Sequence, residues 1–173
     1  MESAPPVGLN GESQISVNSG ELIVPGDPEM TYRDAVMTGA AGWETLFEDG
    51  SCEVEFTCYD PYGYGEAAET AGTVATVGGN APTWPAFELT ASGGASLKVS
   101  HTGTGEFILL EGPFTAGDKV RLDCADENAL LGSQDARTMV VLESTFFAFA
   151  PGDNRLAFSG CSAHRTTWHE RWV

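Results

Sequence analysis

Along the second half of the chain, apolar and polar residues alternate in a series of short runs. In the runs around Phe87, Val99 and Leu122, every second residue is apolar, which is the period of a half-buried β-strand. The side chains expected to point into the core are Phe87, Leu89, Val99, Leu122, Leu156 and Phe158. Glycine-, proline- and aspartate-rich turns separate the runs. Many short strands between turns are typical of a β-sandwich or jelly roll, so we predict an all-β domain at residues 66–173.

Other runs refine this picture. Residues 73–77 and 129–131 predict short strands, the latter followed by a turn at 132–135. Residues 107–110 and 139–142 are apolar throughout, so both predict strands covered on two faces. The last strand is expected at residues 164–172, with Trp168 and Trp172 on one face. Because tryptophans bury large areas, this pair is expected in the core or at the domain edge.

Before this domain lies a shorter and less regular segment, residues 1–65. Residues 1–20 are expected to be a mobile arm and 21–24 a short strand. Asp27 as N-cap and Pro28 at the first helical position predict a short helix, ended by Gly39 and Gly42. These features predict a partial, β-rich N-terminal segment with one short helix.

A strand at residues 53–58 ends this segment. Val54, Phe56 and Cys58 alternate with polar neighbours, and Asp60-Pro61 then stops the ladder because proline has no N–H to donate. Gly63 and Gly65 follow, and glycine allows backbone conformations that other residues rarely adopt. The sequence therefore predicts a domain boundary here.

Charge is concentrated in the first part of the chain. The 173 residues carry a formal net charge of −17. Residues 1–69 hold 14 acidic side chains and one basic side chain, a net −13, and the remaining residues carry −4. Nucleic acids and anionic membranes are bound through Lys and Arg, so neither is expected as a partner. The first 30 residues have no signal-peptide pattern, and no apolar stretch is long enough to predict a membrane span.

Little in the sequence indicates catalysis, a metal or a cofactor. The four cysteines, Cys52, Cys58, Cys124 and Cys161, contain no C-x-x-C pair and are expected to be buried thiols. His164 and His169 would point to opposite faces of a strand, which disfavours joint ligation. Residues 123–128 resemble no known calcium loop and are interpreted as an exposed acidic turn. No nucleophile or phosphate-binding motif is present, so we expect no enzyme activity and no cofactor.

Aromatic side chains are the better candidates for binding. Trp84 lies in a loop between two prolines and Trp43 lies near glycines. Aromatic faces of this kind contact glycans or protein partners, although the same side chains also fill cores.

Three segments resemble the distal tail protein of siphophages. Residues 56–62 (Phe-Thr-Cys-Tyr-Asp-Pro-Tyr) are similar to the strand–proline–aromatic exit from the family's N-terminal domain. Residues 80–85 (Asn-Ala-Pro-Thr-Trp-Pro) are similar to the start of its C-terminal domain. Residues 150–156 (Ala-Pro-Gly-Asp-Asn-Arg-Leu) resemble the turn before its closing strands, and Arg171-Trp172 stand where its last strand ends.

The resemblance implies a virion structural protein, made in the bacterial cytoplasm and located in the tail. Copies would form a ring, commonly hexameric, that joins the tail tube to the host-recognition machinery, with a galectin-like or carbohydrate-module-like sandwich projecting outward. Residues 1–65 are shorter than the family's ring domain and would be a partial version of it. The carboxylates expected on an acidic channel or partner face are Glu44, Glu48, Asp49, Glu53 and Glu55. The alternative is a monomeric carbohydrate-binding module that recognises a cell-surface glycan.

Overall fold

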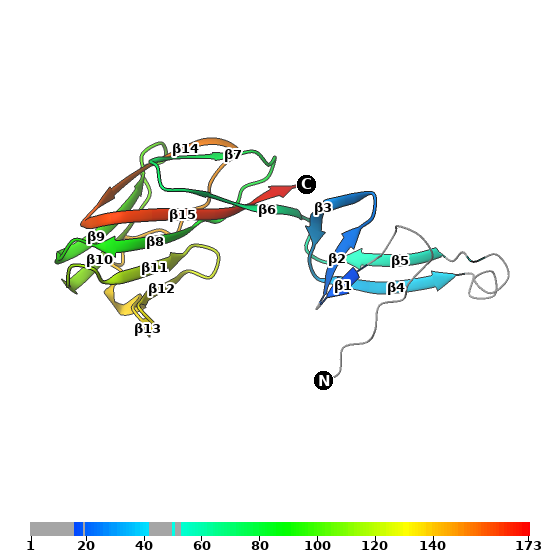
Figure 1. The fold of residues 1–173 in the computed structure, drawn as a ribbon, viewed down its shortest axis with the longest axis horizontal. Coiled ribbons are helices and arrows are strands. Elements are labelled where there is room, and N and C mark those ends of the chain that lie inside the picture. The colour runs from blue at the N-terminus through cyan, green and yellow to red at the C-terminus, as the bar shows by residue number, and fades with distance from the viewer. Residues whose placement is uncertain (1–15, 19, 42–49, 51–52) are drawn as a thin grey trace. The chain divides into compact units, whose positions relative to one another are not determined.

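The computed structural model describes residues 16–18, 20–41, 50 and 53–173, and in these residues it is built of β-strands (Figure 1). The all-β prediction is confirmed. The chain divides into two compact units. The first contains the described residues up to Gly65, and the second comprises residues 66–172.

The first unit consists of two small antiparallel groups of strands. One has the order β1–β2–β3–β6, in which only the first residues of β6 belong to this unit. The other, here called the β4–β5 ribbon, is a separate two-stranded sheet. The strands are β1 (Ser16–Asn18), β2 (Glu21–Val24), β3 (Asp27–Tyr32), β4 (Ala35–Ala41), β5 (Glu53–Cys58) and β6 (Gly63–Thr70). The strand predicted at residues 53–58 is confirmed, including its alternation of half-buried and exposed side chains.

The predicted helix after Asp27 is wrong. Residues 27–32 form β3, which pairs with β2 and with the start of β6. Asp34 then takes a left-handed conformation, with φ of 52°, and this turn separates β3 from β4. Capping signals are local, and here the pairing of β3 with two neighbouring strands outweighs them. The mobile-arm prediction is also wrong for residues 16–18, which pair with β2; the rest of that prediction, apart from Gly20, lies outside the described residues.

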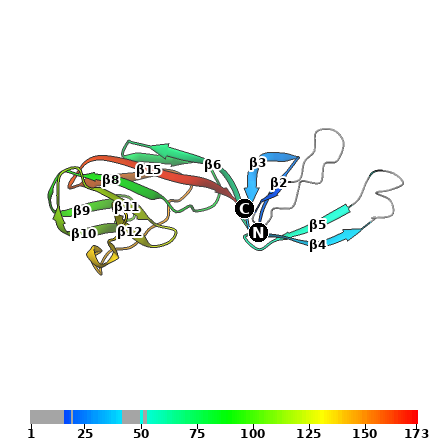
Figure 2. The same cartoon turned by 60° about the horizontal axis from the view of Figure 1, so that its bottom comes forward.

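The second unit is a sandwich of two antiparallel sheets (Figures 1 and 2). One sheet has the order β6–β15–β8–β11–β12–β13 and the other β10–β9–β14–β7. Its strands after β6 are β7 (Val74–Val77), β8 (Ala86–Ala91), β9 (Gly94–His101), β10 (Phe107–Phe114), β11 (Lys119–Asp123), β12 (Asn128–Leu131), β13 (Gln134–Asp135), β14 (Gly152–Ser159) and β15 (Cys161–Trp172).

The core between the sheets contains the side chains that the alternation predicted. Phe87, Leu89, Val99, Leu122 and Leu156 are buried, and the half-buried Phe158 packs against them. Aromatic rings from outside the strands complete the core: Phe147 and Phe149 lie 5.7 and 6.3 Å from the Phe87 ring. Trp168 is buried and meets Phe149 edge to face, as expected for a core tryptophan.

The strand predicted at residues 139–142 is wrong. Met139 ends a 3-10 turn (Arg137–Met139) instead of starting a strand, and the chain then runs along the edge of β10. The Val141 N–H donates to the Leu109 carbonyl (2.9 Å), and the Thr145 N–H donates to the Phe107 carbonyl (2.8 Å). This segment covers the edge of β10, and residues 107–110 are apolar on both faces beside it. Residues 134–135, expected in a turn, pair with β12 as β13.

The described cysteines are free thiols. Cys124 is buried, and burial raises its pKa to about 12. Cys58 and Cys161 are only half-buried, so the prediction of buried thiols is correct for Cys124 and wrong for these two. Cys58 lies in the two-stranded β4–β5 ribbon, which offers little to cover a side chain, and Cys161 is the first residue of β15. Cys52 lies outside the described residues.

Candidate functional site

The loop between β7 and β8, which carries Trp84, is fastened to the end of β15. The Ala81 N–H donates to the Arg171 carbonyl (3.1 Å), and the Thr83 hydroxyl donates to the His169 carbonyl (2.6 Å). The Arg171 guanidinium donates to the Pro82 carbonyl (2.9 Å). The loop is therefore held by hydrogen bonds at three successive residues, none of which involves the Trp84 side chain.

Trp84 is a partly exposed aromatic ring on this ordered loop. Its side chain is 43% exposed, and the Arg171 guanidinium lies 4.7 Å from the ring centroid. Arg171 is buried, and a cation shielded from water in this position contributes up to about 2 kcal/mol. A rigid, partly exposed tryptophan is the type of side chain that anchors binding interfaces. The structure thus leaves Trp84 suited to contact a glycan or a protein.

Of the acidic residues expected on one face, the structure describes two. Glu53 and Glu55 are exposed on β5, on the face opposite the half-buried Val54 and Phe56. Trp43, Glu44, Glu48 and Asp49 lie outside the described residues.

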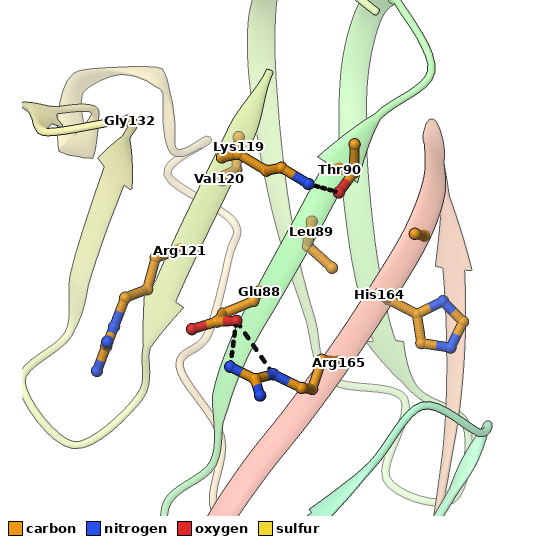
Figure 3. A pocket seen from close by; sticks show the side chains of 10 residues that line it. Glu88, Leu89, Thr90, Lys119, Val120, Arg121, Gly132, His164 and Arg165 are labelled. Atoms are coloured by element: carbon orange, nitrogen blue, oxygen red, sulfur yellow. Dashed lines mark hydrogen bonds and ion pairs between the residues drawn. The ribbon is translucent and has the colours of Figure 1, made fainter. Parts of the chain in front are cut away.

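A hollow on the outer face of the second unit brings basic side chains together across three strands (Figure 3). We call it the basic hollow. Its volume is about 440 Å³. Strand register places Arg121 of β11 and Arg165 of β15 on either side of Glu88 of β8. In the next row, Lys119 and Ala163 flank Thr90. Thr90 and Ala163 are small, so they leave an open space beside the long side chains of Lys119, Arg121 and Arg165.

The cations of the basic hollow are held in different ways. Arg165 donates to Glu88 through Nε and Nη2 (3.1 and 2.8 Å) and to Glu69 through Nη1 (3.2 Å). The hydrogen bond to Glu88 raises the pKa of Arg165. The Lys119 ammonium donates to the neutral hydroxyl of Thr90 (2.7 Å), and no carboxylate of the described residues pairs with it. Arg121 reaches the Asp123 carboxylate only at 3.4 Å. Among the described residues, Lys119 is therefore the cation of the hollow without a carboxylate partner, and the ion pair of Arg121 is longer than those of Arg165.

The sequence pattern did not identify the basic hollow. It correctly places Lys119 and Arg121 on the outward side of β11, at alternate positions. What it lacks is the register that aligns β11 with Glu88 of β8 and Arg165 of β15, because cross-strand neighbours are far apart in the chain.

The residues considered for metal binding lie apart in the described structure. His164 stacks on Phe158, with ring centroids 3.8 Å apart, whereas His169 is exposed. In the acidic turn, the Asp123 carboxylate accepts the backbone N–H of Ala125 (3.1 Å). Within the described ranges, no three His, Cys, Asp or Glu side chains are grouped to hold a metal. In the same ranges, none of the helical structure has the length and apolarity of a membrane span.

Comparisons with known proteins give one family match and one likeness in fold. Residues 78–172 match the family "Siphovirus-type tail component, C-terminal domain". The chain is similar in fold to the crystal structure of the SPP1 Dit protein, described as a paradigm of the hub adsorption apparatus in phages that infect Gram-positive bacteria. That match has a TM-score of 0.73 and 20% sequence identity, and it covers 88% of this chain. The chain spans 64% of the length of the SPP1 Dit structure. None of the curated proteins compared with the chain matches it.

The family match extends over more than half of the chain and coincides with the sandwich. This chain therefore belongs to the family of siphovirus-type tail components.

Proposed function

We propose that this chain is a structural component of the phage tail tip or baseplate, which links the tail tube to the host-recognition machinery by protein–protein contacts. The observation that carries the proposal is the family match over residues 78–172. In this role the chain works in the virion tail, by assembly and not by catalysis. Its net charge of −17 suits a protein that stands beside DNA without retaining it, because polyanions repel each other and retention requires basic groups.

The first unit supports self-assembly in this proposal. The β4–β5 ribbon has an apolar face that includes Met37 and Phe56, and the Met37 side chain is 58% exposed. Two-stranded sheets are marginal by themselves in water and require packing against another element. We infer that a second copy of the chain covers this face, and that copies close into a ring, six in number as the family resemblance implies.

Sedimentation of the full chain and negative-stain microscopy test this proposal. We expect concentration-dependent oligomers and ring-shaped particles. Met37→Asp places a charge on the exposed apolar face and is expected to shift the chain to monomer. Leu142→Asp is the matched control, since Leu142 is 98% exposed on the second unit, and it should leave assembly unchanged. A chain that stays monomeric at high concentration would contradict self-assembly.

Trp84 supports a second candidate function, the recognition of a host-surface glycan. An ordered aromatic ring can stack on the apolar face of a pyranose, and Trp84 is held on a fastened loop with part of its surface exposed. Binding of the chain to purified cell-wall saccharides, compared with Trp84→Ala, tests this role. If the two proteins bind equally, Trp84 does not contact the saccharide.

A further inference from the structure

We propose that the basic hollow binds an extended acidic segment of a partner protein, in which carboxylates occupy alternate positions of a strand. The proposal builds on the assembly role proposed above and adds to it a binding site and the chemistry of its ligand. In this proposal Lys119 and Arg121 of β11 contact the carboxylates, with Thr90 of β8 and Arg165 of β15 beside them (Figure 3). Ala163 also lines the hollow, next to Thr90 in the strand register.

The spacing of the cations matches an extended ligand. Lys119 and Arg121 stand at alternate positions of β11 and are both exposed, so their Cα atoms lie about 7 Å apart. Alternate side chains on one face of any extended strand have this same separation. A segment of the form acidic–any–acidic, laid along β11, thus brings one carboxylate to each cation.

Charge distinguishes this hollow from the rest of the molecule. Three of the chain's eight Lys and Arg side chains line it. Glu88 is the carboxylate of the lining, and Glu69 and Asp123 pair with Arg165 and Arg121 from outside it. The chain as a whole carries −17. An acidic ligand is repelled by most of this surface and attracted here, which favours docking in one place. Contacts between exposed charges each contribute about 0–1 kcal/mol, so this site alone would bind weakly. Within an assembly it would determine where the acidic segment docks and which partner is accepted.

The lining favours a polypeptide over a saccharide. Among the lining residues there is no Trp, Tyr or Phe, and the His164 ring is stacked on Phe158. The aromatic platform that sugar faces use is therefore missing from this hollow. Nucleic acid is disfavoured as well, because the negative charge of the whole chain opposes a long polyanion.

A peptide titration tests the site on the full chain. The probe is a peptide of alternating Thr and Glu, and the matched control is the same peptide with Gln in place of Glu. We expect the Glu peptide to shift amide NMR signals of β8, β11 and β15, with little response to the Gln peptide. Raising the salt concentration should weaken binding several-fold, since the contacts are exposed ion pairs.

Charge-reversal variants locate the contact. Lys119→Glu with Arg121→Glu is expected to lower the affinity for the Glu peptide by about tenfold or more. The matched control, Lys98→Glu with Arg155→Glu, makes the same change in net charge on the opposite sheet and should stay within about threefold. Glu88→Gln removes the opposing carboxylate and should tighten binding. If the double reversal fails to fold, Lys119→Gln with Arg121→Gln replaces it.

Three results would overturn the proposal. Lys119 and Arg121 do not bind carboxylates if the chain has equal affinity for the Glu and Gln peptides. The same conclusion follows if the Lys119/Arg121 and Lys98/Arg155 charge reversals have equal affinity for the Glu peptide. Binding of polygalacturonate but not of the peptide makes the ligand an acidic saccharide. Loss of self-association in the Lys119/Arg121 variants, together with no peptide binding, makes the occupant a second copy of this chain. Peptide binding and Met37-dependent assembly are measured separately, so either can fail without the other.

Discussion

The second unit buries a cluster of aromatic and aliphatic side chains between two sheets, whereas the described part of the first unit buries only Leu22 and Ala35 among its apolar side chains. The first part of the chain also carries most of the negative charge. Stability in water requires enough apolar burial to offset the entropy lost on folding. From this difference in burial we expect the second unit to fold by itself and the first unit to need further contacts.

The most direct test of this difference is to express the two units separately. A fragment of residues 66–173 is expected to unfold cooperatively, because it keeps both sheets and the core between them. A fragment of residues 1–65 is expected to show no cooperative transition as a monomer. Scanning calorimetry of each fragment and of the full chain measures this. A sharp transition in the isolated 1–65 monomer would contradict the dependence on partners.

Removal of a core ring should have the next largest effect. Phe87 is fully buried and contacts the rings of Phe147, Phe149 and Phe158. Phe87→Ala is expected to lower the free energy of unfolding by about 3–5 kcal/mol, through lost burial and the cavity that remains. Leu142→Ala, at an exposed site of the same unit, should change it by less than about 0.5 kcal/mol. Urea denaturation of both variants gives the values; similar losses would place Phe87 outside the core.

Cysteine labelling compares the packing of the two units directly. At neutral pH the thiolate is the reactive form, and burial holds the pKa of Cys124 at about 12. Cys58 of the first unit is half-buried. We expect a thiol reagent to modify Cys58 much faster than Cys124 in the folded chain, with the difference lost in denaturant. Peptide mass spectrometry over time measures each site, and equal rates before unfolding would show that the sandwich is open at Cys124.

The smallest expected effect concerns an exposed ion pair of the second unit. Hydrogen bonds from the Arg137 side chain lower the pKa of Asp135 from 3.8 to about 2. A carboxylate with a lowered pKa adds stability above its unfolded pKa and loses it as the pH falls toward 2. Arg137→Ala should return the pKa of Asp135 toward 3.8, as measured by NMR titration of its carboxyl carbon. An unchanged pKa would assign the shift to other neighbours.

The sequence by itself determined the strands whose two faces differ. Along β8, β9, β11 and β14, apolar residues at every second position require one face to be buried, and this fixes which side chains form the core. The same reasoning located β5 and the stop at Asp60-Pro61. It also identified Trp84 as a candidate contact, because a tryptophan between prolines in a loop has no strand partner to cover it.

Only the tertiary structure decided where local signals compete or where distant residues meet. Asp27-Pro28 carries the signals of a helix start, yet pairing with β2 and β6 makes residues 27–32 a strand. Residues 139–142 are as apolar as a central strand, yet after the 3-10 turn the chain follows the edge of β10. The basic hollow joins residues 88, 119 and 165 through strand register. Register depends on the packing of the whole sheet, and for that reason no stretch of the chain encodes it alone.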